Sequence, residues 1–318
     1  MKIVKDFNFK NKKAIVRVDF NVPLNADFEV TDATRIQAAK PTITEILAQG
    51  GSCVLMSHLG RPKGFQEAFS LRHIVKSIEA IMGCNVKFIE DCIGEKVEAA
   101  VANLQAGEIL LLENLRFYEE EKKGDVAFAE KLSKFGDIYV NDAFGTAHRA
   151  HASTTIIAQF FENNKCFGNL LAREIESIDK VLNNSEKPVL AILGGAKVSS
   201  KITVIENILD KVDHLIIGGG MSFTFIKAQG GKIGNSICED DKMELALDIL
   251  KQAKEKNVQI HIPVDVIAAD DFSNAANIKI CDIDAIPDGW EGVDAGPKSR
   301  EIFDTVVNTC KTILWNGP

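Results

Sequence analysis

The chain has 318 residues, of which 46% are hydrophobic, so it can bury a sizeable core and we expect two domains at about 150 residues each. Its formal net charge of -8 argues against general nucleic-acid binding, which leaves a basic footprint. The seven cysteines are scattered and include no CxxC pair, which predicts reduced thiols. The chain has no apolar leader and no apolar run near ~18 residues. We therefore expect a cytoplasmic protein with no membrane partner.

Short apolar runs alternate with amphipathic patterns along the whole chain. One group of expected strands covers residues 14–20, 52–57, 86–89, 109–114 and 137–142. A second group covers residues 188–194, 214–218, 258–263, 278–281 and 312–315. Because most intervening stretches have helical periodicity, the pattern predicts an α/β protein with two parallel sheets and right-handed crossovers.

A helix is expected between the two groups of strands. Apolar residues from Leu171 to Leu182 recur with helical spacing, and the turn-forming sequence NNSEKP ends the pattern. The sequence therefore predicts an N-terminal lobe over residues 1–165, an interdomain helix over 166–185 and a C-terminal lobe over 186–318.

The first strand ends in RVDFNVP, residues 17–23. Period-2 alternation places Arg17, Asp19 and Asn21 on one face, opposite a face of buried apolar residues. Taken alone, this triplet fits a solvent-facing edge as well as it fits a ligand site.

Basic residues gather at or after the expected strands of the first group, and Arg35 begins the first long helical pattern. They are Arg17, Arg35, His58, Arg61, Arg116, His148, Arg149 and His151. Ligands of open parallel sheets bind beyond the carboxyl ends of the strands, and the guanidinium fork suits carboxylates and phosphates. The cluster predicts a small, multiply anionic ligand, although Arg17 could instead be a structural partner of a nearby acid.

The second group of strands has two strand–glycine–helix junctions. In GGAKVSSK, Lys197 and Lys201 are expected to be neighbours on one helix face, where they could bind phosphate or simply be solvated. At 218–220, three glycines would give flat access to a nucleobase or ribose, or would serve tight packing. The acids at 119–121 are expected to lie on a solvated face, and no Cys/His array predicts a metal site.

Eight ordered motifs carry a resemblance to a known family. RVDFNVP, SHLGRPKG, LLENLRFYEEE, NDAFGTAHRAHAST, GGAKVSSKI, GGGMSFTF, GWEGVDAGP and LWNGP resemble, in order and spacing, phosphoglycerate kinase. The resemblance implies two Rossmann-like lobes joined by a helix. It also implies reversible phosphoryl transfer between 1,3-bisphosphoglycerate and ADP, giving 3-phosphoglycerate and ATP in cytosolic glycolysis, with Mg²⁺ carried by the nucleotide. We expect a monomer with small-molecule substrates.

The resemblance also implies residue roles. Asp19 and Asn21 match positions for the glycerate hydroxyl and carboxyl end, and the basic patch around its phosphate and reacting carboxyl comprises Arg35, His58, Arg61, Arg116 and Arg149. The nucleotide positions are Gly195, Ala196, Lys201, Gly219, Gly220, Gly292, Asn316 and Pro318. Arg35 and Lys197, one from each lobe, are the expected catalytic pair for the transferring phosphoryl group.

The chain departs from the family pattern after LWNGP. Family members continue with a glutamate for the ribose and a GGGD[ST] loop whose aspartate binds the metal, and the 318 residues contain neither. We therefore expect an incomplete C-terminal lobe and assign no metal-binding residue. The alternative function is an inactive fragment that binds only 3-phosphoglycerate. An NAD-dependent dehydrogenase is set aside because GxGxxG is absent after the first strand.

Overall fold

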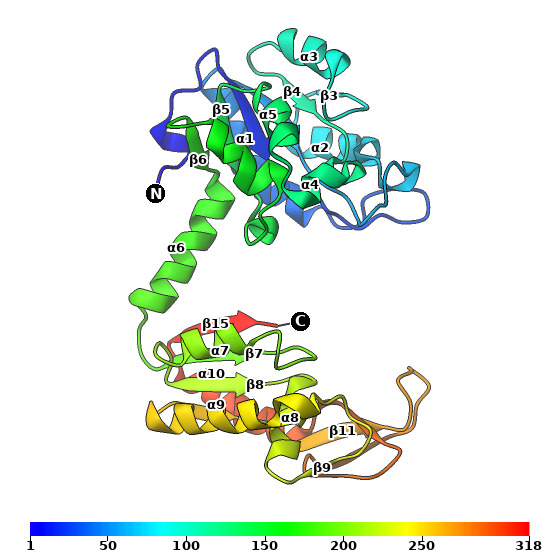
Figure 1. Ribbon diagram of the computed structural model, residues 1–318, viewed down its shortest axis with the longest axis vertical. Helices are drawn as coiled ribbons and strands as arrows, with labels where there is room; N and C mark the ends of the chain where they lie inside the picture. The colour runs from blue at the N-terminus through cyan, green and yellow to red at the C-terminus, as the bar shows by residue number, and fades with distance from the viewer. Residues whose placement is uncertain (318) are drawn as a thin grey trace. The chain divides into compact units, whose positions relative to one another are not determined.

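The computed structural model describes residues 1–317 of the chain (Figure 1). Two compact units are present: unit 1 covers Met1–Glu176, and unit 2 begins at Ser177. The division falls within helix α6 (Asn169–Asn183). Each unit has its own sheet and its own hydrophobic core, as expected for separate domains.

Unit 1 contains a six-stranded sheet in the order β3-β4-β2-β1-β5-β6, and every neighbouring pair is parallel. Its strands are β1 (Lys13–Arg17), β2 (Ser52–Met56), β3 (Val86–Phe88), β4 (Ile109–Leu111), β5 (Ile138–Asn141) and β6 (Lys165–Phe167). The predicted parallel sheet is confirmed. The edge strand β6 was not predicted, because its sequence KCF contains no apolar run.

Helices cover both faces of this sheet (Figure 1). They are α1 (Thr34–Ala48), α2 (Val75–Met82), α3 (Glu95–Ala102), α4 (Glu119–Lys123) and α5 (Val126–Ser133). Apolar side chains of α1 and α2 pack on one face, and those of α3 and α5 pack on the other. This two-sided cover explains why the strands read as continuous apolar runs.

Single helical turns complete unit 1, and one more lies in unit 2. They are η1 (Val4–Asp6), η2 (Glu67–Phe69), η3 (Leu71–Ile74), η4 (Leu115–Phe117), η5 (Phe144–Thr146), η6 (Ala152–Ile156), η7 (Ile157–Phe160) and η8 (Asp240–Lys242). Four of them, η4, η5, η6 and η7, lie in the segments that follow β4 and β5. These segments carry much of the basic cluster predicted from the sequence.

Unit 2 is built on a four-stranded parallel sheet in the order β10-β8-β7-β15. Its strands are β7 (Val189–Leu193), β8 (His214–Ile217), β10 (Gln259–His261) and β15 (Thr312–Asn316). The helices of the unit are α7 (Ile202–Ile208), α8 (Met221–Ala228), α9 (Met243–Glu255) and α10 (Pro297–Thr309). The predicted second parallel sheet is therefore confirmed.

One predicted strand of unit 2 belongs to another sheet. β12 (Ile278–Asp282) pairs antiparallel with β11 (Asp265–Ala269), which pairs antiparallel with β14 (Glu291–Ala295). The alternation of exposed and half-buried residues along β12 explains the difference, since a strand with one solvated face is typical of an antiparallel sheet. The short strands β9 (Lys232–Ile233) and β13 (Ala285–Ile286) form a further parallel pair.

Candidate active site

The segment after β1 departs from the strand that the sequence predicts. β1 ends at Arg17, and only the amide of Val18 continues the ladder, donating to the carbonyl of Met56 at 3.0 Å. Arg17 is 1% exposed, whereas Asp19 and Asn21 are accessible from a pocket. The prediction that the three polar residues share one strand face is therefore wrong, because the chain leaves the sheet before Asp19.

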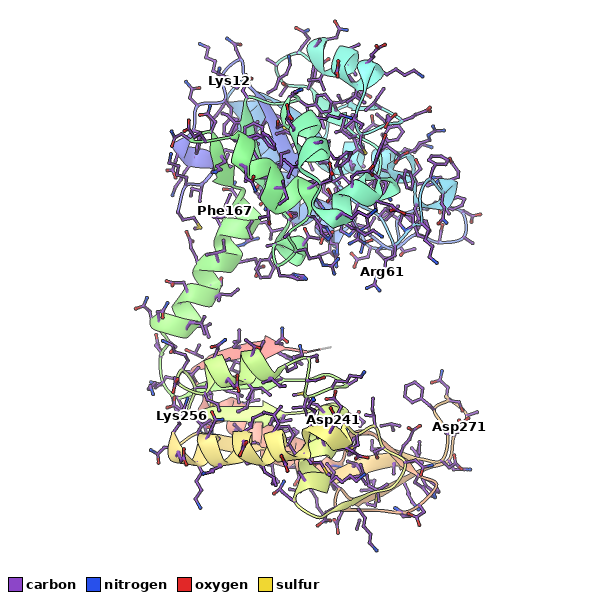
Figure 2. The ribbon with its side chains drawn as sticks, viewed as in Figure 1. Lys12, Arg61, Phe167, Asp241, Lys256 and Asp271 are labelled. Atoms are coloured by element: carbon purple, nitrogen blue, oxygen red, sulfur yellow. The ribbon has the colours of Figure 1, made fainter. Side chains whose placement is uncertain are left out.

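All seven predicted substrate-binding residues line one pocket of about 270 Å³ in unit 1. They come from the segments that follow β1, β2, β4 and β5 and from the first turn of α1. The lining residues are Asp19, Asn21, Arg35, His58, Gly60, Arg61, Arg116, Gly145, Thr146 and Arg149. Figure 2 labels Arg61, whose side chain projects outward from the segment after β2.

Hydrogen bonds hold the pocket walls together. Nη1 of Arg35 pairs with Oδ2 of Asp19 at 2.5 Å. The loop at Gly60 is held from two sides, because its amide donates to Oδ1 of Asn21 at 2.8 Å and its carbonyl accepts from Nη1 of Arg116 at 2.5 Å. Four segments that are distant in sequence are thus tied around one hollow.

The pocket is strongly positive. Four guanidinium groups and a single carboxylate, that of Asp19, line it. Burial first, and then the neighbouring guanidinium groups with that of Arg17 foremost, together lower the pKa of His58 to about 2. Burial also lowers the pKa of Arg116, which lies beside Arg149. His58 is therefore neutral near pH 7, and the charge of the pocket comes from the arginines.

Three lining residues were not predicted: Gly60, Gly145 and Thr146. Each lies next to a predicted residue in SHLGRPKG or AFGTAHR, so the motifs themselves contained the signal. A Cβ on Gly145 would lie 2.7 Å from Oδ2 of Asp19, which shows how closely the backbone approaches the acid. His148 and His151 do not line this pocket; His148 instead accepts a hydrogen bond from Nε of Arg149 at 3.2 Å.

Glu121 corrects another expectation. The acids at 119–121 were expected on a solvated face, but Glu121 is 1% exposed. Its carboxylate accepts from the amide of Ser153 at 2.9 Å and from the Ser153 hydroxyl at 2.6 Å. Helical spacing explains the difference, because Glu121 lies on the face of α4 that packs against η6 while Glu119 and Glu120 remain exposed.

In unit 2, the predicted glycine junctions meet at the carboxyl ends of β7, β8 and β15. The amide of Gly194 donates to the carbonyl of Asn316 at 3.0 Å. The amide of Met221 donates to the carbonyl of Gly195 at 2.9 Å. A Cβ on Gly220 would lie 3.3 Å from Cα of Ala196. Nζ of Lys201 donates to Oδ1 of Asn316. Gly195, Ala196, Lys201, Gly219, Gly220 and Asn316 therefore lie together.

The two lysines of this junction do not share a helix face as expected. α7 begins at Ile202, so Lys197 and Lys201 both precede it, and Lys197 is exposed. Glu239 accepts from the amide of Ser199 at 2.9 Å and from its hydroxyl at 2.5 Å. Such hydrogen bonds to backbone and hydroxyl groups favour a turn over a helix, which explains the late start of α7.

Two nucleotide positions predicted from the resemblance lie apart from this junction. Gly292 belongs to β14, where its amide donates to Oγ of Ser236 at 2.9 Å. A side chain at Gly292 would collide with Phe223 of α8, the helix that begins after Gly220. Gly292 is thus connected to the glycine junction through α8. Pro318 lies outside the described residues.

Neither a metal cluster nor a membrane helix occurs within residues 1–317. No group of three or more His, Cys, Asp or Glu side chains in this part of the chain could hold a metal ion. No helix there is both long enough and apolar enough to cross a bilayer.

Comparison with known proteins agrees with this geometry. A family model described as Phosphoglycerate kinase matches residues 4–318. A phosphoglycerate kinase of Porphyromonas gingivalis is 50% identical, with the match covering 99% of this chain and 81% of that protein. A cytosolic phosphoglycerate kinase of Nicotiana tabacum is 48% identical, with the match covering 99% of this chain and 78% of that protein. The solved phosphoglycerate kinase of Coxiella burnetii aligns with a TM-score of 0.83 at 38% identity, over 99% of this chain and 79% of that one. The chain therefore belongs to the phosphoglycerate kinase family of enzymes.

Proposed function

We propose that the chain catalyses reversible phosphoryl transfer between 1,3-bisphosphoglycerate and ADP, giving 3-phosphoglycerate and ATP, and that the pocket of unit 1 binds the glycerate substrate. The observation that carries the proposal is the convergence of Arg35, Arg61, Arg116 and Arg149 on one pocket of an acidic protein. A ligand bearing a carboxylate and a phosphate matches four guanidinium forks, because each fork can donate two parallel hydrogen bonds to such groups.

Within this pocket, Asp19 and Asn21 are proposed to hold the glycerate hydroxyl and carboxyl end. Their side-chain oxygens are acceptors beside four guanidinium groups that only donate, and a hydroxyl needs an acceptor for its proton. His58 and the arginines bind the phosphate and the reacting carboxyl. The pairing of Asp19 with Arg35 keeps both side chains oriented before the substrate arrives.

The glycine junction of unit 2 is proposed to bind the nucleotide. Backbone at Gly195, Ala196, Gly219 and Gly220 gives close access to phosphate and ribose, and Lys201 supplies positive charge. Gly292, Asn316 and Pro318 complete the proposed set. Mg²⁺ is usually bound through one or two carboxylates together with substrate phosphates, so we propose that it arrives with ATP or ADP.

The chemistry requires alignment and charge stabilisation rather than a general base. The acceptor in the ATP-consuming direction is a carboxylate, which is ionised near pH 7. A loose phosphoryl transition state gains from cations around its equatorial oxygens, and Arg35 and Lys197 are the proposed catalytic pair. Bringing the two substrates together and excluding water would use a hinge-bending motion of the lobes.

A coupled assay with 3-phosphoglycerate and MgATP tests the proposed reaction, run beside calorimetry with 3-phosphoglycerate alone. We expect turnover and saturable binding in the same preparation. Binding without turnover would contradict the proposed reaction while leaving the glycerate pocket in place. A monomeric protein located in the cytoplasm is proposed with this function, in keeping with the cytosolic tobacco relative.

A further inference from the structure

A continuous row of buried polar side chains lies behind the pocket of unit 1. It runs from Glu121 to Ser153, Arg17 and finally His58, which lines the pocket. The four residues come from α4, η6, β1 and the segment after β2. Each is at most 4% exposed, so the hydrogen bonds between them are shielded from water and geometrically restricted.

Arg17 determines which nitrogen of His58 carries the proton. Its Nη2 lies 3.2 Å from Nδ1 of His58, its Nε donates to Oγ of Ser153 at 2.8 Å, and its Nη1 donates to the carbonyl of Val18. A guanidinium group has donors only, so Nδ1 of His58 must present a lone pair. Oδ1 of Asp19, at 3.9 Å from Nδ1, is too far away to accept a proton from it.

The other ring nitrogen of His58 faces the pocket. Within residues 1–317, Oδ2 of Asp142 is the only fully buried side-chain nitrogen or oxygen without a hydrogen bond. Among the described residues Nε2 of His58 has no hydrogen-bond partner and is not among the fully buried atoms, so it is open to the hollow that His58 lines. In neutral imidazole the proton that Nδ1 lacks is on Nε2. The ring therefore presents an uncharged donor to the pocket.

Glu121 fixes the direction of the row. Its Oε1 is 2.6 Å from the Ser153 hydroxyl and its Oε2 is 2.9 Å from the Ser153 amide. A carboxylate only accepts, so the hydroxyl donates to Glu121 and turns its lone pairs toward Nε of Arg17. Other ionisable groups near this carboxylate are Nδ1 of His151, 3.7 Å from Oε1, the guanidinium of Arg116, the Tyr139 hydroxyl and the Cys92 thiol.

We propose that Glu121 and Ser153 are positioning residues that act through Arg17 to hold His58 as the Nε2–H tautomer, so that it donates a hydrogen bond to an anionic oxygen of the ligand. The identity of that ligand rests on the proposed function, whereas the tautomer does not. The arginines already supply positive charge, and a neutral donor adds a hydrogen bond of defined direction. That bond favours one position of the acceptor oxygen over others.

The tautomer of His58 is tested by ¹⁵N NMR of histidine-labelled protein at pH 7 without substrate. The signal of His58 is identified by its loss in His58→Gln. We expect a pyrrole-type Nε2 and a pyridine-type Nδ1 in the unaltered chain. Ser153→Ala and Glu121→Gln should both populate the Nδ1–H tautomer, and Glu120→Gln, on the exposed side of the same helix, should not.

Kinetics provide the second readout. Losing one well-placed hydrogen bond to a charged group should raise KM for 3-phosphoglycerate about tenfold in Ser153→Ala and leave KM for ATP within about twofold. Should Glu121→Gln fail to fold, Ser153→Ala, which removes a single oxygen, decides the question. A protonated Nδ1 in the unaltered chain, or an unchanged tautomer in Ser153→Ala, would overturn the proposal. Absence of turnover in the unaltered chain would count against the proposed function instead.

Discussion

Gly219 lies so close to Gly195 that a Cβ on Gly219 would be 2.9 Å from both the amide nitrogen and the carbonyl oxygen of Gly195. The φ of Gly219 is +66°, a conformation that costs an alanine about 1 kcal/mol. Both glycines belong to the junction where β7 and β8 end. Close backbone contact, and not only flexibility, therefore requires glycine at this position.

Gly219→Ala should destabilise unit 2 by more than the φ penalty alone, since the methyl group must push the junction apart. Gly230→Ala is the matched control: its φ is +91°, but a Cβ there would meet nothing within 4 Å. Urea unfolding of both variants measures the difference, and KM for ATP should rise only in Gly219→Ala. Equal loss of stability in the two variants would mean that the contact with Gly195 has no energetic consequence.

Arg35→Ala should reduce kcat about 100-fold while changing KM for ATP little, because the guanidinium is proposed to stabilise charge that develops in the transition state. Arg72→Ala is the control, since the side chains of Arg35 and Arg72 are both 51% exposed and each pairs with one acid. Arg72 lies outside the pocket, where an exposed pair contributes about 1 kcal/mol or less. An unchanged kcat in Arg35→Ala would refute its catalytic assignment.

Gly145→Ala should weaken the glycerate site without unfolding the protein. The new Cβ would lie 2.7 Å from Oδ2 of Asp19 and 4.0 Å from Nη1 of Arg35, so it should displace the Asp19–Arg35 pair. We expect KM for 3-phosphoglycerate to rise several-fold, roughly the effect of about 1 kcal/mol. Steady-state kinetics beside a thermal melt separate this effect from a loss of stability. An unchanged KM would show that the carboxylate adjusts to the methyl group.

Asp142 should make the stability of unit 1 depend on pH. Burial raises its pKa from the ordinary 3.8 to about 6, and its Oδ2 has no hydrogen-bond partner. Its Oδ1 accepts from the amides of Leu170 and Leu171 at the start of α6. The folded state therefore binds more protons than the unfolded state between pH 3.8 and 6. The stabilisation from this protonation is complete below about pH 3.8 and is lost as the pH rises through about 6.

Asp142→Asn removes this titration. The unaltered chain should lose about 3 kcal/mol of unfolding free energy between pH 4 and pH 7, from a shift of about two pKa units, and the variant should not show this loss. Urea unfolding of unit 1, followed by tyrosine and histidine NMR signals, measures it. Asp27→Asn, in an exposed turn, is the control for general pH effects. Parallel pH profiles for Asp142→Asn and the unaltered chain would contradict the assignment.

Much of the architecture could be predicted from the sequence because buried parallel strands are continuous apolar runs. The same reasoning brought the pocket residues together, since side chains such as His58 and Arg116 lie in the segments after strands whose carboxyl ends share one edge. Proximity of segments at one sheet edge is a topological consequence and needs no knowledge of side-chain contacts. β12 was misplaced because its apolar residues alone do not reveal which sheet it joins.

Details that depend on tertiary hydrogen bonds were out of reach of sequence reasoning. The end of β1 at Arg17 is one example, because Arg17 is drawn inward by Ser153, a residue 136 positions away. The burial of Glu121 has the same origin, since only the packing of α4 against η6 brings it to Ser153. The turn at Lys197 likewise depends on Glu239, 40 positions from Ser199.

The most direct test of the central claim is a titration of the protein with 3-phosphoglycerate followed by backbone ¹H–¹⁵N NMR. Binding in the pocket of unit 1 predicts concerted shift changes at the amides of Asp19, Asn21, Gly60, Gly145 and Thr146, all of which belong to its lining. Shift changes confined to residues outside this lining, with these five amides unmoved at saturation, would contradict the assignment of the pocket.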